Sequence, residues 1–189
     1  MILVTVGTEK FPLNRLMEWI DNLINQKLIQ PEKEEVLIQY GSCTFLPKNI
    51  TGYSILRETE FLSLVAKARI IIAHCGEGSL DLLGSINKPF ILVPRSYNFR
   101  EHVDDHQVEL ADQLAKLGVP IANHQEDLVN FLAQPFVAKL PVTPAKYYAQ
   151  VSLLLEDEFE TDLVRKELSD ELIGTPDFLH ILAEKNDFS

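Results

Sequence analysis

The chain has few of the features that would place it in several common classes of protein. Two cysteines, Cys43 and Cys75, occur among its 189 residues, and they form no C-x-x-C pair. A disulfide framework or a zinc site is therefore not expected, and a reduced cytoplasmic compartment is the simplest setting. No apolar run approaches the ~20 residues needed to cross a bilayer. The apolar segment 2–6 lacks a basic region before it, so it is typical of a strand rather than of a signal peptide.

Clustered positive charge is also missing. The formal net charge is −11, and it is unevenly distributed. Residues 1–149 contain 14 Lys and Arg against 17 Asp and Glu, whereas residues 150–189 contain 3 against 11. The acidity therefore belongs mainly to the C-terminal segment. Because nucleic-acid backbones require clustered Lys and Arg, we expect no nucleic-acid partner.

Hydrophobic residues make up 46% of the chain, which allows a sizeable core, and their pattern alternates between strands and helices. We expect strands at 2–6, 36–40, 53–56, 69–74, 89–94 and 119–122. We expect helices at 11–29, 60–67, from the 75–79 turn to 86, at 102–117 and at 127–133. This alternation predicts an α/β fold with a doubly wound, Rossmann-like parallel sheet.

A break follows the last of these helices. Residues 133–143 contain Pro135 and Pro141, and the segment beyond them combines helical patterns with the acidic charge. The sequence therefore predicts a Rossmann-like nucleotide-sugar-binding domain at residues 1–134. An α-helical acidic C-terminal extension is expected at residues 135–189.

A glycine-rich turn follows the fourth expected strand. The C-G-E-G-S sequence of residues 75–79 contains Gly76 and Gly78 and opens a helix. Glycines let backbone N–H groups approach a ligand without an intervening Cβ, and the helix start adds unpaired N–H groups and a positive dipole end. These features predict an anion site suited to a diphosphate, to which His74 and Ser79 can donate. A tight βα turn without a ligand would show the same local pattern.

A second polar segment, E-H-V-D-D-H-Q at residues 101–107, follows the fifth expected strand. Asp104 and Asp105 suit the first turn of a helix as partners of its dipole. Together with His106 and Gln107 they offer the mixed donors and acceptors that the hydroxyls of a sugar require. A metal bound by these groups is the alternative, but no further ligand cluster lies nearby in the sequence, so none is expected.

Two shorter turns follow the first two expected strands. Gly7 and Thr8 end the first strand and would face the same crevice as the glycine-rich turn, while Gly41 plays a similar part after the second strand. Neither turn fits G-x-G-x-x-G, so the dinucleotide-binding fingerprint is absent.

Taken in order, these motifs resemble the C-terminal domain of glycosyltransferase family 28. The ordered motifs are V-T-V-G-T at 4–8, Q-Y-G at 39–41, H-x-G-x-G-S at 74–79, K-P with V-P-R within 88–95, and D-x-H-Q-x-E-L-A at 104–111. The resemblance covers roughly residues 1–130. It points to the small donor-binding subunits of split glycosyltransferases of the exopolysaccharide, capsule or dolichol-linked type.

The resemblance implies a fold and a ligand. The domain would be the C-terminal half of a GT-B fold and would bind a UDP-sugar as substrate, without a cofactor or a metal. Gly76, Gly78 and Ser79 would face the diphosphate, with His74 stabilising the leaving group. The segment 55–57 would lie beside the base.

The resemblance also implies a partner. His106 and Gln107 would contact the donor sugar, but the acceptor site and the catalytic base would lie on a separate, membrane-attached subunit that carries a lipid-linked acceptor. The expected reaction is transfer of a hexose-type sugar to a lipid-linked saccharide. The chain would be cytoplasmic, or peripheral at the cytoplasmic face of a membrane through that partner.

One position departs from the family pattern. Many relatives place a glutamate that grips the ribose in the helix after the glycine motif, and Leu82 stands at the matching position here, with Asp81 one residue earlier. One residue along a helix is a rotation of ~100°, so ribose recognition by a carboxylate is in doubt. Glu77 must also point away from any bound phosphate.

Two further functions stay open. A non-catalytic nucleotide-sugar-binding module that regulates a partner would keep the fold and lose sugar transfer. A self-contained hydrolase or epimerase would need a general base in this chain, for which Asp105, His106 and His74 are the candidates.

Overall fold

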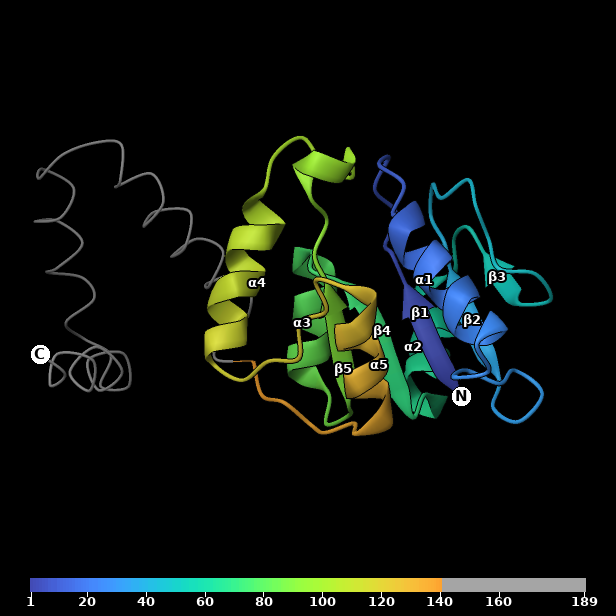
Figure 1. Ribbon diagram of the computed structural model, residues 1–189. Helices are drawn as coiled ribbons and strands as arrows, with labels where there is room; N and C mark the ends of the chain where they lie inside the picture. Colours follow the sequence, from blue (N-terminus) through green and yellow to red (C-terminus); the bar gives the residue numbers. More distant parts are fainter. Residues whose placement is uncertain (141–189) are drawn as a thin grey trace, which may run out of the picture. The chain divides into compact units, whose positions relative to one another are not determined.

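The computed structural model describes residues 1–140 and shows a five-stranded parallel sheet (Figure 1). The strands are β1 (Ile2–Thr5), β2 (Val36–Gln39), β3 (Thr51–Tyr53), β4 (Ile70–His74) and β5 (Phe90–Val93). They lie in the order β3-β2-β1-β4-β5. The expected α/β fold with a Rossmann-like parallel sheet is confirmed, while the helices expected in the C-terminal extension lie outside the described residues.

The central strands are buried on both faces, as continuous apolar runs predict for a parallel sheet. Every residue of β1, β2, β4 and β5 is buried. Strand β1 pairs with β2 on one side, where Ile2 is opposite Val36, and with β4 on the other, where Ile2 is opposite Ile70. All strands run the same way, so their carboxyl ends share one edge of the sheet.

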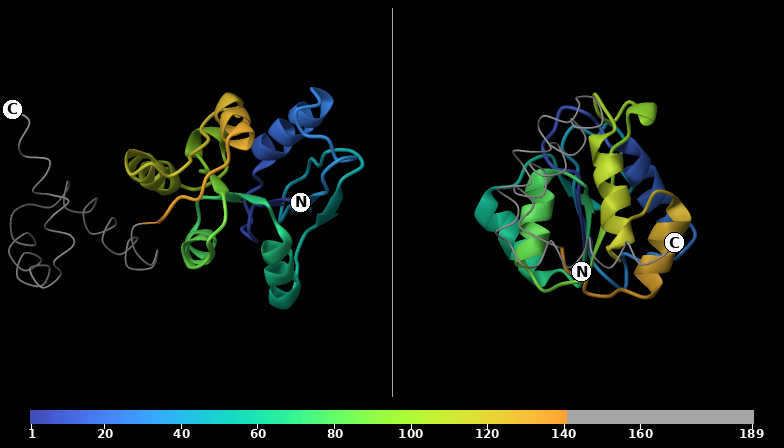
Figure 2. Two further views of the ribbon diagram at one scale, coloured as in Figure 1. Left: turned by 90° about the horizontal axis from the view of Figure 1, so that it is seen from below. Right: turned by 90° about the vertical axis from the view of Figure 1, so that its left-hand side faces the viewer.

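Helices cover both faces of this sheet (Figure 2). Helices α1 (Asn14–Asn25) and α5 (Gln125–Ala133) lie on one face, and α2 (Glu58–Lys67) and α3 (Glu77–Ser85) lie on the other. Helix α4 (His106–Lys116) lies at the β5 end of the sheet, and a short 3₁₀ helix, η1 (Tyr97–Phe99), precedes it.

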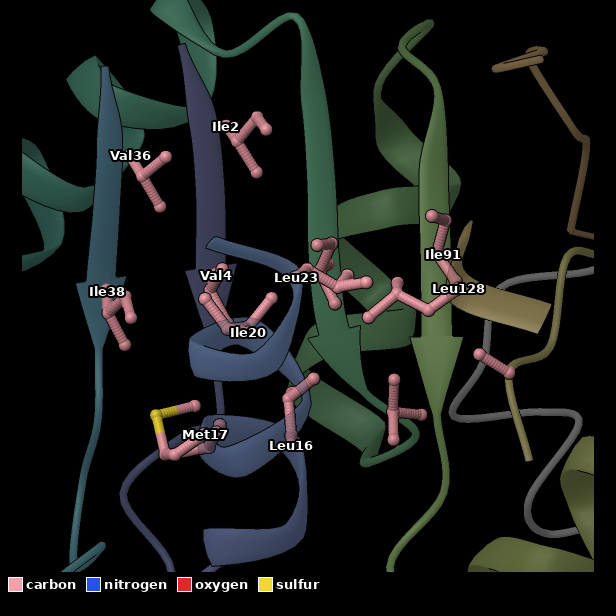
Figure 3. Packing of buried hydrophobic residues seen from close by; sticks show 14 of the residues in the cluster. Ile2, Val4, Leu16, Met17, Ile20, Leu23, Val36, Ile38, Ile91 and Leu128 are labelled. Carbon is pink, nitrogen blue, oxygen red and sulfur yellow. The ribbon is translucent and has the colours of Figure 1, made fainter. Parts of the chain in front are cut away.

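The main core lies between the sheet and helix α1. Leu16, Met17, Ile20 and Leu23 recur at helical spacing, are fully buried, and pack over the strands (Figure 3). On the same face, Leu128 of α5 lies beside β5. This anchoring holds the sheet rigid, so the loops at its carboxyl edge extend from fixed points.

Two predictions near that edge were wrong in their bounds. Helix α1 begins at Asn14, so Pro12 precedes the helix instead of occupying its first turn. Helix α4 begins at His106, because the preceding segment 101–105 folds back on η1 through side-chain hydrogen bonds. The 3₁₀ helix η1 was not predicted, because hydrogen bonds between Ser96 before it and Glu101 and Asp105 after it hold it in place.

The predicted outer strands also differ. The third strand lies at Thr51–Tyr53, before the predicted range 53–56. The segment 119–122 contributes a single parallel bridge, from Ile121 to Leu92, instead of a full strand.

Candidate functional site

The order of the strands creates a switch point between β1 and β4. The chain leaves β1 for a helix on one face of the sheet and leaves β4 for a helix on the other. In open α/β sheets, ligands bind outside the carboxyl ends of the strands at such a point, because the diverging connections leave a crevice. The two strands flanking this point end at Thr5 and His74, and Gly7 and Gly76 follow them closely.

Gly76 lies at the N-cap of helix α3, and the helix starts with Glu77. Because glycine has no side chain, it cannot cap the helix, and no other described side chain does so. The amides of Glu77, Gly78 and Ser79 are therefore first-turn donors without an intrahelical partner. A helix start of this kind carries positive partial charge and can bind an anion.

The residues of this first turn differ in exposure. Glu77 and Gly78 are exposed, and Ser79 is half-buried. A Cβ built on Gly78 meets no heavy atom within 4 Å, so the space beside its amide is open.

The ring of His74 lies between the two glycine turns. A Cβ at Gly7 would come within 2.5 Å of His74 Nε2, and a Cβ at Gly76 would overlap the other side of the same ring. The side chain therefore fills the space that larger residues at either turn would need. Both glycines are required by this packing, and Gly7 also has a positive φ of 70°.

His74 is buried and neutral. Burial, together with the smaller electrostatic effects of Arg95 and His102, lowers its pKa to about 3. Its Nδ1 atom is buried without a hydrogen-bond partner in the described part of the chain. Of the two contributions open to an imidazole, a hydrogen bond or a positive charge, the lowered pKa favours the neutral hydrogen-bonding group.

The turn after β1 brings Gly7 and Thr8 to the same edge. Gly7 N donates to Thr5 Oγ1 over 3.4 Å, and Thr5 in turn donates to the carboxamide of Gln39 on the neighbouring strand. Thr8 is exposed. Its hydroxyl is thus accessible to a ligand at the edge that carries the helix start of α3.

The predicted sugar-contacting segment divides into buried and exposed parts. Gln107 is 7% exposed, and its Oε1 accepts from the backbone N of Arg95 over 3.2 Å. His106 is exposed, with Nδ1 3.4 Å from Glu109 Oε2. Gln107 is therefore committed through its oxygen, and only its amino group can donate to a ligand.

Asp105 uses one of its carboxylate oxygens within the fold. Its Oδ1 accepts from Ser96 Oγ over 3.0 Å and from Tyr97 N over 2.8 Å. The carboxylate thus fixes the start of η1 to the start of α4. Asp105 holds the shape of the loop, and its committed oxygen is not free for a ligand.

A buried charged cluster lies beneath these loops, and its residues had no predicted role although two of them belong to the motifs V-P-R and E-H-V-D-D-H-Q. Arg95 is fully buried, and Glu101 is 2% exposed. The guanidinium of Arg15 binds the carboxylate of Glu101 with two contacts, at 3.0 and 2.9 Å. Arg95 directly follows the expected strand 89–94, and this position could have indicated the cluster, because buried charges require partners.

The segment 55–57 lies beside an open hollow on the α2 face. The residues lining it include Tyr53, Ile55, Leu56 and Thr59. Ile55 is 70% exposed. A planar base bound beside segment 55–57 would occupy this hollow.

The departure at Leu82 persists in the structure. Leu82 is half-buried in α3, while Asp81 is exposed.

Among residues 1–140, no group of three or more His, Cys, Asp or Glu side chains is arranged to hold a metal ion. No helix in that range is long and apolar enough to cross a membrane.

The strand order, with its switch point between β1 and β4, and the uncapped start of α3 define a Rossmann-like type of domain. Residues 1–142 match the model of the glycosyltransferase family 28 C-terminal domain. The match spans most of the chain, and the chain belongs to this family.

Curated relatives agree with this assignment. The chain is similar to the UDP-N-acetylglucosamine transferase subunit ALG13 of two strains of Cryptococcus neoformans var. neoformans serotype D, JEC21 and B-3501A. Each is 35% identical over 117 residues, which make up 61% of this chain and 51% of the relative. The chain thus spans about half the length of the curated relatives it matches. No solved structure matches it significantly.

Proposed function

We propose that the chain is the donor-binding subunit of a UDP-sugar-dependent glycosyltransferase that transfers a hexose-type sugar to a lipid-linked saccharide. It would act together with a membrane-attached subunit that binds the acceptor and supplies the catalytic base. The observation that carries this proposal is the uncapped start of α3 at the switch point, beside the unpartnered Nδ1 of buried His74. The family membership supports it.

The chemistry of transfer matches what these groups offer. Negative charge develops on the leaving UDP as the bond to the sugar breaks. Donors that are already oriented toward that charge stabilise the transition state without reorganisation. In our proposal the amides of Gly78 and Ser79 and the dipole of α3 fill this role. Neutral His74 adds a hydrogen bond at most, because its pKa of about 3 keeps it uncharged at neutral pH.

The sugar would lie toward the start of α4. The amino group of Gln107, the imidazole of His106 and the second carboxylate oxygen of Asp105 are the groups that would contact hydroxyls, since Gln107 Oε1 and Asp105 Oδ1 already accept internal hydrogen bonds. Thr8 would complete the site from the β1 side.

A non-catalytic, regulatory donor-binding module is the second candidate, and Leu82 favours it. A half-buried leucine cannot bind the ribose hydroxyls as a carboxylate does, and Asp81 points from a different side of α3. Reconstitution separates the two functions. In a transferase, Gln107→Ala lowers turnover of UDP-sugar by the two-subunit complex, whereas in a regulatory module turnover is unchanged.

The experiment that tests the proposal titrates UDP into the full chain by calorimetry and then assays transfer from UDP-sugar. We expect saturable UDP binding by the chain alone and transfer to a lipid-linked acceptor only after a companion subunit is added. The product of a neighbouring reading frame with one membrane-spanning helix is the companion to try first. Absence of UDP binding would contradict the proposal, and transfer or hydrolysis by the chain alone would point to a self-contained enzyme.

A further inference from the structure

The side chain of Arg95 joins several segments at the carboxyl edge of the sheet by hydrogen bonds, but it is not exposed to a ligand. Its side chain is fully buried. Its guanidinium donates to Val6 O over 2.7 Å, to Phe11 O, and to Glu101 O over 3.3 Å. The first two carbonyls flank the turn of Gly7 and Thr8, and the third lies in the segment that leads to α4.

The backbone of Arg95 extends this network. Its amide donates to Oε1 of Gln107 over 3.2 Å, which fixes the orientation of that carboxamide. One residue thus binds the turn after β1 with its side chain and the start of α4 with its backbone. These are the two segments that the proposed donor site brings together.

Arg15 and Glu101 hold the same segment from outside. Arg15 Nη2 donates to Pro94 O over 2.8 Å as well as to the carboxylate of Glu101, and that carboxylate accepts from Ser96 N over 3.2 Å. Arg15 also lies over the ring of Phe99 in η1, 4.7 Å from its centroid. The positions of η1 and of the chain before α4 therefore depend on this pair.

The cluster carries more positive than negative charge. Arg15 and Arg95 face one buried carboxylate, that of Glu101, and exposed Glu9 is the other carboxylate that acts on Arg95. Arg95 also acts electrostatically on His74 beside the glycine turns. Burial of a guanidinium is costly, so a buried arginine beside the turn of Gly7 and Thr8 calls for a reason beyond packing.

We propose that the buried Arg95–Glu101–Arg15 network positions the Gly7 turn and the Gln107 segment for the diphosphate and sugar of the donor. Arg95 is a positioning residue that also places a fixed positive charge beneath the diphosphate. This inference rests on the proposed function, since it assumes that a nucleotide diphosphate binds at this edge.

The test compares UDP with uridine, which lacks the phosphates, on Arg95→Gln, Arg95→Lys and Arg15→Gln variants of the full chain. Affinities are measured by NMR titration, and folding is checked by circular dichroism and thermal unfolding. Arg69→Gln is the matched control, because Arg69 precedes β4 at the opposite edge of the sheet and pairs with Glu34 there. It removes one positive charge without touching the network.

We expect Arg95→Gln to weaken UDP binding about three- to thirtyfold, the range over which residues outside a site modulate its affinity. Uridine binding should stay unchanged. Arg95→Lys should rescue part of the loss, since it keeps the charge but reaches fewer carbonyls. The Arg69→Gln control should bind UDP like the unmodified chain.

The inference is overturned if a folded Arg95 variant binds UDP as the unmodified chain does, or if UDP and uridine lose affinity equally. If neither Arg95 variant folds, the Arg15→Gln variant decides, because it removes the ion pair with Glu101 at a partly exposed position. Weaker UDP binding by this variant supports the inference, and unchanged binding overturns it. Failure of the proposed function gives a different result, since the unmodified chain would then not bind UDP.

Discussion

A single substitution at Gly78 should change stability and ligand binding in opposite directions. A Cβ at this position meets no heavy atom within 4 Å, so Gly78→Asp introduces no clash at its Cβ. Gly78 lies in the first turn of α3, where an acidic residue stabilises the helix dipole by about 0.3–1 kcal/mol. We therefore expect the unfolding temperature of Gly78→Asp to equal or exceed that of the unmodified chain.

The carboxylate introduced by Gly78→Asp should repel the donor diphosphate and weaken its binding. Two unit charges ~5 Å apart repel by about 1–3 kcal/mol for effective dielectric constants between about 80 and 20. That energy corresponds to a loss of roughly five- to 150-fold in affinity. Isothermal calorimetry with UDP measures the loss, which should shrink as salt screens the repulsion.

Gly78→Asn is the matched control, because it adds a side chain of the same size without the charge. We expect it to retain most of the UDP affinity. Equal affinity of Gly78→Asp and the unmodified chain would refute the placement of the diphosphate at α3. An equal loss in both variants would show that the effect is steric and would refute the electrostatic argument.

Three predictions concern stability. Gly7→Ala should lower the free energy of unfolding by about 1–3 kcal/mol more than Gly118→Ala: both glycines have positive φ, but only Gly7 would bring a Cβ against His74, and overpacking costs this much. The pKa of His74 is lowered from 6.5 to about 3, so the unfolded chain takes up a proton first, and stability should fall by up to about 1.4 kcal/mol per pH unit from pH 6.5 downward. The pKa of Glu34 is lowered from 4.5 to about 2, chiefly by Arg69, so its contribution is present above pH 4.5 and is lost as the pH falls toward 2. Because this pair is partly exposed, that contribution should be under about 1 kcal/mol.

Urea denaturation at several pH values checks all three. Equal costs for Gly7→Ala and Gly118→Ala would contradict the close packing of His74. His74→Gln should flatten the slope between pH 6.5 and 4.5, and an unchanged slope would assign it to other groups. Glu34→Gln should lose less stability than the unmodified chain between pH 4.5 and 2, and an identical loss would contradict the role of the ion pair.

The sequence predicted the sheet because its signal is local. A continuous apolar run such as Ile70–Ile72 is typical of a parallel strand that is buried on both faces. Apolar residues at helical spacing, as from Leu16 to Leu23, are typical of a helix that packs one face on the sheet. The glycine-rich turn was equally visible, since glycines directly after a buried strand mark a close approach of the backbone. The bounds at the carboxyl edge were less predictable, because side-chain hydrogen bonds from Glu101 and Asp105 determine where α4 begins.

The chemical state of the site residues could not be predicted from the sequence. His74 looked like a titratable donor, but its pKa depends on burial between two glycine turns and on Arg95, which is 21 residues away in the chain. Asp105 looked free to bind a sugar, but it holds Ser96 and Tyr97. Both outcomes depend on long-range packing. The resemblance to the family predicted where the site lies, and the structure shows which of the predicted side chains already form internal hydrogen bonds.

An NMR titration of the isotope-labelled full chain with UDP tests most directly whether the start of α3 binds the diphosphate. We expect saturable shifts of the amides of Gly76, Gly78 and Ser79, together with that of Gly7 after β1. Saturable shifts confined to other parts of the chain, or no shifts at all, would contradict the claim that the start of α3 binds the donor diphosphate.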